Sequence, residues 1–224
     1  MADRKLPRHV YHMAEATNWA SIQATGLLPA SRLIEIAGVT GEERRRLERE
    51  QRPEHTALPN GVRIRDQKPM PADALRVCLV GVTPAEWYAL VNARVFFWLD
   101  PERLNRQRAA CGPRPQVVLT LDAVALAEAY RESAAVTPIN TGNARRKPAM
   151  RGAATFIPYP TWLGSAWASE AAALGIPERS RGHAPVELTI AAPIPDALGY
   201  VVTTQELGAG QPFDPAANKR AKQT

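Results

Sequence analysis

Apolar positions along this chain fall into short runs with two different spacings. Runs that are apolar at every position or at every second position predict β-strands at 6–13, 94–99, 116–122, 135–139, 186–190 and 198–203. Runs with helical spacing predict short helices, among them 18–25, 31–37, 41–51 and 123–130. Strands and helices do not alternate regularly, so the predicted fold class is α+β rather than a regular series of βαβ units.

Two helix starts are marked by their capping residues. Thr83-Pro84-Ala85-Glu86 combines a threonine cap, a proline in the first turn and an acidic residue close behind. Asp100-Pro101-Glu102-Arg103 repeats the cap and the proline directly after an aromatic strand. Gly26 predicts the end of the first helix, because glycine readily adopts the backbone conformation found after a helix.

The chain shows no internal repeat and no linker-like segment, and its 224 residues suit one core. We therefore expect a single domain over residues 1–207. The segment 208–224 ends in several basic residues and is predicted to be a disordered tail. The longest apolar runs are too short to cross a bilayer, and the basic N-terminus lacks the apolar stretch of a signal peptide. The sequence thus predicts a cytoplasmic protein with no membrane partner.

Several common kinds of functional site lack their motifs here. Cys78 and Cys111 form no CxxC pair and only four histidines are present, so we expect no metal site. No P-loop, no GxGxxG motif after a strand, no GxSxG nucleophile elbow and no HExxH motif occurs in the sequence. These absences exclude the commonest cofactor folds and most hydrolase classes.

The chain carries 28 Lys and Arg against 22 Asp and Glu, which gives a net charge of +6. Such a charge favours an acidic partner, and a nucleic acid or the phosphates of a dinucleotide both qualify. The alternative is a composition rich in Ala, Arg and Pro, which is found in basic proteins that bind nothing acidic. Charge alone leaves both interpretations open.

Three short segments far apart in the sequence combine aromatic, histidine and carboxylate residues. The first is Tyr11-His12-Met13 followed by Trp19, Ile22 and Gly26-Leu27-Leu28. The second is RVFFWLDPER at 94–103, and the third is VELTIAAPIP at 186–195. In this order they resemble the opening, the aromatic strand and the catalytic-glutamate strand of the ADP-ribosyltransferase superfamily. Within it, the similarity is greatest to the DarT-type DNA ADP-ribosyltransferases.

The resemblance implies a fold, an activity and partners. The fold would be a split, mixed β-sheet core with short flanking helices. The activity would be mono-ADP-ribosyl transfer from NAD, used as a substrate, to a nucleic acid, with DNA favoured and nicotinamide released. Such an enzyme could act as a toxin or defence factor with an antitoxin partner. Three alternatives stay open: an NAD glycohydrolase, a non-catalytic basic nucleic-acid-binding domain, and an interaction or immunity module.

The resemblance assigns the central chemistry to Glu187. Transfer from NAD⁺ breaks the bond between nicotinamide and ribose through an oxocarbenium-like transition state, which a nearby carboxylate stabilises. His12 is expected to bond the adenine-side ribose, so that His12 and Glu187 would meet across one cleft. Each residue has a plain alternative, namely an exposed glutamate at a strand end and a buried structural histidine.

The resemblance and the residue types supply the other candidate site residues. One of the aromatic residues Tyr11, Phe96, Phe97 and Trp98 is expected to stack on nicotinamide, with Phe97 as first choice, because an aromatic face suits a flat cationic ring. Arg103, and secondarily Arg94, would meet the pyrophosphate or assist at the acceptor. Further NAD contacts are expected from Tyr11, Met13, Trp19, Gly26, Asn140 and Thr141. The nucleic acid is expected at Arg145, Arg146, Lys147 and Arg151. The alternatives are core aromatics, a solvated arginine and a flexible surface loop.

Two positions depart from the family pattern. The family often has threonine two residues after the first histidine, where this chain has Ala14. Two residues before the glutamate, transferases that modify arginine carry Glu or Gln, and this chain has Pro185. Proline cannot engage a guanidinium, which disfavours arginine as the acceptor and is compatible with a nucleic-acid base.

Overall fold

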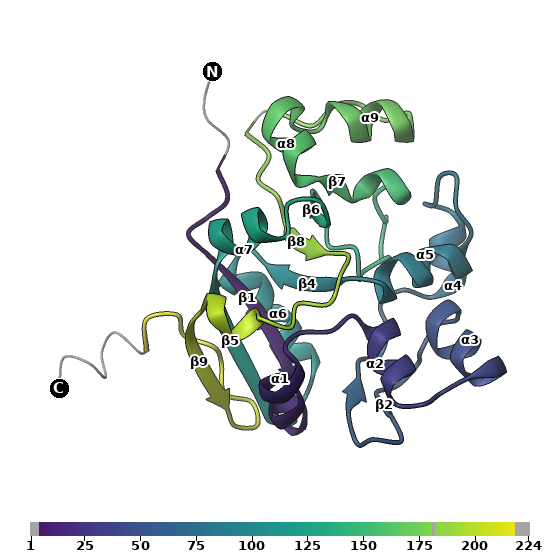
Figure 1. Ribbon diagram of the computed structural model, residues 1–224. Coiled ribbons are helices and arrows are strands. Elements are labelled where there is room, and N and C mark those ends of the chain that lie inside the picture. The colour runs from purple at the N-terminus through teal and green to yellow at the C-terminus, as the bar shows by residue number, and fades with distance from the viewer. Residues whose placement is uncertain (1–4, 181, 218–224) are drawn as a thin grey trace.

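The computed structural model describes residues 5–180 and 182–217, and within them the chain forms one large antiparallel sheet flanked by short helices (Figure 1). The sheet has seven strands in the order β7-β6-β8-β4-β1-β5-β9, and every pairing between these described strands is antiparallel. The α+β class is therefore confirmed, whereas the predicted mixed sheet is wrong. The strands are β1 His9–Glu15, β4 Val95–Trp98, β5 Gln116–Asp122, β6 Ala134–Thr137, β7 Ile157–Pro158, β8 Glu187–Ile190 and β9 Val201–Leu207.

Short helices and a small hairpin complete the described elements. The α-helices are α1 Trp19–Thr25, α2 Ala30–Ile36, α3 Gly41–Arg49, α4 Ala72–Arg76, α5 Pro84–Asn92, α6 Pro101–Ala110, α7 Ala123–Ala129, α8 Tyr159–Ser165 and α9 Ala168–Leu174. The 3-10 turns are η1 Ala16–Asn18, η2 Ala153–Thr155 and η3 Ala197–Tyr200, and the hairpin pairs β2 Thr56–Ala57 with β3 Arg63–Ile64.

Local chemistry explains where two of these helices begin. The Thr83 hydroxyl accepts from the Glu86 backbone N–H at 3.3 Å, and the Thr83 N–H donates to the Glu86 carboxylate at 2.7 Å. This reciprocal pair satisfies two N–H groups that the first turn of α5 leaves open. The Asp100 carboxylate likewise accepts from the Glu102 N–H at 2.8 Å at the start of α6. The predicted caps are confirmed.

The sheet consists of two unequal halves joined at one point. In the first half, β1 and β5 pair over seven residues, and β9 extends the ladder on the other side of β5. In the second half, β4, β8 and β6 pair over four residues each. Between the halves, β1 and β4 share the single register pair Tyr11–Trp98. The junction is therefore the narrowest part of the sheet.

The two faces of the sheet bury different cores. One face carries the largest cluster, in which Val10, Phe97, Leu119 and Leu188 pack with residues of α1, α7 and α8. The opposite face carries two smaller clusters. Tyr11 and Val118 pack there with Leu104 of α6. A separate group is made by Trp87 and Tyr88 of α5 with Leu75 of α4.

Residues 30–64 form a small unit with a core of their own, made of Ile34, Val39, Leu47, Leu58, Val62 and Ile64. Buried Arg52 ties this unit to α5, because its guanidinium donates to the Asn92 side chain at 3.0 Å and to the Leu47 carbonyl at 2.6 Å. The Asn18 side chain ties it to the main sheet by bonding both the N–H and the C=O of Arg63, each at 2.8 Å. This unit forms one wall of the cavity described below.

The segment after β9 departs from the predicted disordered tail as far as residue 217. Phe213 is 3% exposed and packs against Tyr11 with ring centroids 5.3 Å apart. Its backbone N–H and C=O both bond the side chain of Asn105 on α6. Burial of the Phe213 ring against residues on the face of the sheet fixes this segment in place. The remaining part of the tail, 218–224, lies outside the described residues.

Among the helices that the structure describes, none is long and apolar enough to cross a membrane.

Candidate functional site

The three segments that carry the sequence motifs lie side by side in the sheet. Strands β8, β4 and β1 are consecutive neighbours in the sheet, although 79 residues lie between β1 and β4 in sequence and 88 between β4 and β8. Trp98 of β4 pairs with Glu187 on one side and with Tyr11 on the other. The fold thus gathers at its centre three motifs that the sequence keeps apart.

The ends of the first and third motifs also meet, at Gly26. Leu27 and Ile194 exchange both backbone hydrogen bonds, at 3.0 and 2.8 Å. A Cβ on Gly26 would lie 2.1 Å from the Ile194 carbonyl oxygen, and Gly26 has a φ of +74°. Glycine is therefore required here for close packing as well as for conformation.

Glu187 is a buried carboxyl group surrounded by threonines. Its side chain is 4% exposed. The hydroxyls of Thr137 and Thr141 each lie 2.8 Å from Oε2, and the Thr141 N–H lies 3.3 Å from both carboxyl oxygens. Thr137 comes from β6, directly across the ladder, and Thr141 from the turn that follows it. The alternative of an exposed strand-end glutamate is therefore wrong.

Burial raises the pKa of Glu187 to about 7, although the bonds from Thr141 and Thr137 and the charge of Arg151 act in the opposite direction. The Arg151 guanidinium does not form a fork with the carboxyl group. It donates to the backbone carbonyls of Ala149 and Thr141, at 3.0 and 3.3 Å. A carboxyl group that no cation of the described residues contacts, and whose pKa is near neutrality, can exchange a proton under physiological conditions.

His12 lies where the ladder between β1 and β4 stops. Its Nδ1 is 2.9 Å from the carbonyl oxygen of Phe96, which can only accept, so Nδ1 carries the proton. Burial lowers the pKa of His12, against the effect of this bond, and favours the neutral ring. In the neutral ring Nε2 has a free lone pair, so it can accept a hydrogen bond from a hydroxyl or an N–H group.

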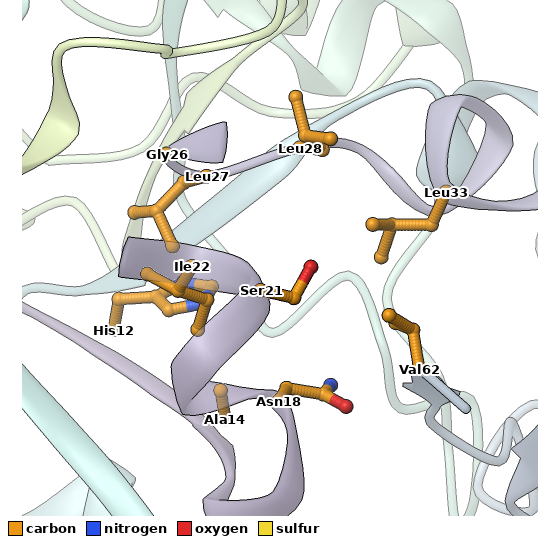
Figure 2. A pocket seen from close by; sticks show the side chains of 10 residues that line it. All are labelled: His12, Ala14, Asn18, Ser21, Ile22, Gly26, Leu27, Leu28, Leu33 and Val62. Carbon is orange, nitrogen blue, oxygen red and sulfur yellow. The ribbon is translucent and has the colours of Figure 1, made fainter. Parts of the chain in front are cut away.

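A small cavity opens beside His12, between the main sheet and the 30–64 unit (Figure 2). Its volume is about 60 Å³, and it is lined by His12, Ala14, Asn18, Ser21, Ile22, Gly26, Leu27, Leu28, Leu33 and Val62. That volume holds about two water molecules. In this form the cavity can take a small polar group but not a whole dinucleotide.

His12 and Glu187 do not converge on one face of the sheet. Paired residues of neighbouring strands share a face, so Glu187 points to the same side as Trp98 and Tyr11. The His12 ring lies 5.6 Å from that of Phe97, which pairs with Leu188 on the opposite side. The expected meeting of His12 and Glu187 across one cleft is therefore wrong, because the two residues have opposite parity along their strands.

The same alternation corrects the assignment of Phe97. Phe97 is 1% exposed within the main core and cannot stack on a ligand. Trp98, the next residue, lies on the face of Glu187 and is partly exposed. Tyr11 and Met13 also lie on that face, where they pack around Leu104, whereas Trp19 packs on the edge of the main core.

The two candidate arginines of the second motif lie at opposite ends of β4. The Arg94 guanidinium stacks on Phe156 at 4.3 Å, and burial lowers the Arg94 pKa to about 10. Arg94 lies before the first residue of β4, whereas Glu187 pairs with Trp98, the last residue of that strand. The four residue steps from Arg94 to Trp98 span about 13 Å along a strand. Arg103 lies on α6 at the near end, with its Nε 3.7 Å from Asp100 and 40% of its side chain exposed. Neither forms a described bond with Glu187.

The basic loop of 140–151 divides into two parts. Asn140 is half-buried beside Thr141, and Arg145, Arg146 and Lys147 are exposed. Arg151 was expected to contact nucleic acid, but it is 2% exposed and its guanidinium lies 5.8 Å from the Trp87 ring. It is an internal brace that holds Thr141, so this assignment is wrong.

Residues 8–201 match the model of a family described as a family of unknown function, DUF7002. The chain belongs to the DUF7002 family. The matched range includes β1, β4 and β8 and ends before the segment that carries Phe213. No curated protein matches the chain.

Sequence reasoning about this DUF7002 chain missed Thr137 as part of the Glu187 surroundings, and it ranked Phe97 ahead of Trp98 as the aromatic residue that would stack on nicotinamide. Thr137 lies at the end of a predicted strand, where a threonine is ordinary. Only the β6–β8 register brings it to Glu187. For Trp98 a signal did exist, since strand alternation already separates Phe97 from its two neighbours. In the described residues, no cluster of three His, Cys, Asp or Glu side chains could hold a metal ion.

Proposed function

We propose that this protein is an NAD-dependent mono-ADP-ribosyltransferase that modifies a nucleic acid, DNA before RNA. One observation carries the proposal: the three motifs of the family resemblance are adjacent strands at the centre of the sheet. Chance similarities in three short segments have no reason to become neighbours in a fold. The Leu27–Ile194 pairing adds a second contact between the first and third motifs.

Glu187 is the carboxylate that would stabilise the developing ribose cation. The transition state carries positive charge at the anomeric carbon, and a carboxylate in a site of low polarity stabilises it strongly. Only the ionised form does so, and a pKa of about 7 keeps both forms accessible. Trp98 replaces Phe97 as the aromatic residue proposed to lie against nicotinamide, because it shares the face of Glu187.

His12 would contact the dinucleotide at the junction of the two half-sheets. Its proton on Nδ1 is held by Phe96, so Nε2 is the atom that would accept from a ribose hydroxyl. His12 and Glu187 face opposite sides of the sheet. A single NAD⁺ molecule that contacts both would therefore have to pass from one face to the other next to the Tyr11–Trp98 pair, where β1 and β4 are least paired. The cavity of about 60 Å³ would have to widen. A displacement of the 30–64 unit, which forms one wall of the cavity, would widen it.

The basic loop supports a polyanionic acceptor. Arg145, Arg146 and Lys147 are exposed and follow directly on the turn that covers Glu187. Phosphates bound by these side chains would bring a nucleotide close to the carboxyl group. Pro185 lies two residues before Glu187 and offers no group for an arginine acceptor.

Incubation with labelled NAD⁺ and separate DNA, RNA and protein acceptors tests the proposal. We expect nicotinamide release and label on nucleic acid, both reduced at least 100-fold by Glu187→Gln, because the amide lacks the negative charge. Glu206→Gln changes an exposed carboxylate on β9 and serves as the matched control. Full activity of Glu187→Gln would remove the mechanism. Free ADP-ribose without labelled acceptor would instead identify an NAD glycohydrolase.

The burial of Glu187 favours one second candidate, a non-catalytic basic nucleic-acid-binding domain. In this candidate, the carboxyl group of Glu187, which is 4% exposed, has a structural role alone: it holds the turn at 138–141. This candidate predicts salt-dependent DNA binding through Arg145, Arg146 and Lys147 with no change in thermal stability on adding NAD⁺.

A further inference from the structure

Thr137 makes two contacts with only one proton to offer. Its hydroxyl oxygen lies 2.8 Å from the Ile139 carbonyl oxygen and 2.8 Å from Oε2 of Glu187. A threonine hydroxyl donates once and can accept through its lone pairs. The Ile139 carbonyl can only accept, so this contact consumes the proton of Thr137.

The second contact then needs a proton from Glu187. If Glu187 is a neutral acid, its O–H donates to Thr137, Thr137 donates to Ile139, and Thr141 donates to the same carboxyl oxygen. If Glu187 is a carboxylate, one of the two contacts of Thr137 lacks a proton. Two oxygen atoms 2.8 Å apart with no proton between them repel each other, so the observed geometry is that of the neutral acid.

The surroundings of Glu187 favour the same state. The turn at 138–141 and strand β6 present the uncharged Thr141 and Thr137, and β4 presents Trp98. Within the part of the chain that the structure describes, the charge that acts on the carboxyl group is that of Arg151, whose bonds go to carbonyl oxygens and whose neighbour is the Cys78 thiol. Burial raises the Glu187 pKa to about 7 in spite of that charge.

We propose that Glu187, Thr137 and the Ile139 carbonyl form a proton-operated latch that stores the carboxyl group as an acid and loosens the 138–141 turn when it ionises. On ionisation the proton leaves Oε2 for solvent water. The Thr137 hydroxyl rotates about its Cβ–Oγ1 bond and donates to the new carboxylate. The Ile139 carbonyl loses its donor, and the turn loses one of the bonds that fix it on the sheet.

The latch would regulate the proposed transferase activity, so its biological role rests on the proposed function. The stored acid cannot stabilise a ribose cation, so the closed form is inactive towards NAD⁺. Ionisation creates the negative charge and at the same time frees the turn that leads into Arg145, Arg146 and Lys147. A polyanion that draws this loop outward would therefore favour the ionised form. Thr137 and Thr141 are positioning residues in this scheme, because they act through Glu187.

Carbon-13 NMR on the full chain, without NAD⁺, tests the latch directly. The side-chain carboxyl carbon of Glu187 and the carbonyl carbon of Ile139 are followed between pH 4 and pH 9, with Glu187→Gln and Ile139→Val assigning the two signals. We expect both to titrate with one midpoint near 7. Thr137→Val should abolish the Ile139 response, and Thr137→Ser, which keeps the hydroxyl, should retain it.

Two results would overturn the latch: a Glu187 midpoint below 5, or an Ile139 carbonyl that stays unchanged while Glu187 titrates. If Thr137→Val does not fold, the wild-type and Thr137→Ser titrations still decide. The outcome is separable from the proposed function. Coupled titration in a protein that leaves NAD⁺ intact supports the latch and rejects the enzyme. NAD⁺ turnover without coupled titration supports the enzyme and rejects the latch.

Discussion

Among the described residues, Glu15, Glu170 and Glu187 are buried, and the surroundings of the last two differ in one respect. Glu170 on α9 is fully buried and receives both Nε and Nη2 of Arg179, at 2.8 and 3.0 Å. Glu187 on β8 is almost as buried but faces two threonines, and its nearest cation donates elsewhere. A guanidinium fork holds the Glu170 carboxylate through two charge-assisted hydrogen bonds. Burial therefore does not distinguish the two carboxyl groups by itself. Among the described residues, a contacting cation does, since Glu170 has one and Glu187 does not.

The largest expected effect comes from removing the fork. Arg179→Met leaves Glu170 buried without its partner and should lower the free energy of unfolding by about 4 kcal/mol. Urea denaturation at pH 7 measures the change. Arg131→Met removes an exposed partner of Glu128 and should change the free energy by less than about 0.5 kcal/mol. If both variants lowered the free energy of unfolding by a similarly small amount, the hydrogen bonds between Arg179 and Glu170 would not be important for stability.

A smaller effect is expected from pH at Glu187. Its folded pKa is about 7, above the value of about 4.3 in an unfolded chain. The folded state thus binds the proton more tightly, and stability falls as pH rises from about 4 to about 7, by at most about 3 kcal/mol. Other groups titrate over this range, so the measurement is the difference between wild type and Glu187→Gln at pH 5 and at pH 8. A difference that does not change with pH would place the Glu187 pKa in the ordinary range.

The smallest effect should follow the loss of one threonine hydroxyl. Thr141→Val removes the bond to Oε2 and should lower the free energy of unfolding by about 1 kcal/mol at pH 5. The loss should be larger at pH 8, because a hydroxyl stabilises a charged acceptor more than a neutral one. Thr141→Ser keeps the donor and should behave as wild type in both denaturation series. Equal losses at the two pH values would mean that Thr141 only fills space.

Much of the fold could be predicted from local signals. The limits of β5 and the caps of α5 and α6 agree with the sequence pattern, because alternation and capping depend on neighbours in the chain. The order of the seven strands could not be predicted, since β1 pairs with partners 80 or more residues away. The packing of Phe213 was missed for the same reason, because its partner Asn105 is remote in sequence.

The candidate site was predictable in residue type but not in orientation. Glu187 and His12 were identified from motifs, and their strands are indeed close. Their faces depend on the register of β4 with both neighbours, which a single sequence does not specify. Arg151 illustrates a further limit. Its position in a run of basic residues indicates a solvated charge, and only the contacts with Thr141 and Trp87 identify it as an internal brace.

The single register pair between β1 and β4 has a mechanical consequence. Each half-sheet keeps its own continuous ladder, so the Tyr11–Trp98 contact can act as a pivot. Side-chain packing still joins the two halves there, because Val10 and Leu119 share one core with Phe97 and Leu188. The backbone ladder of the sheet is therefore thinnest at its middle, next to His12, and the shared core rather than hydrogen bonding holds the two halves together.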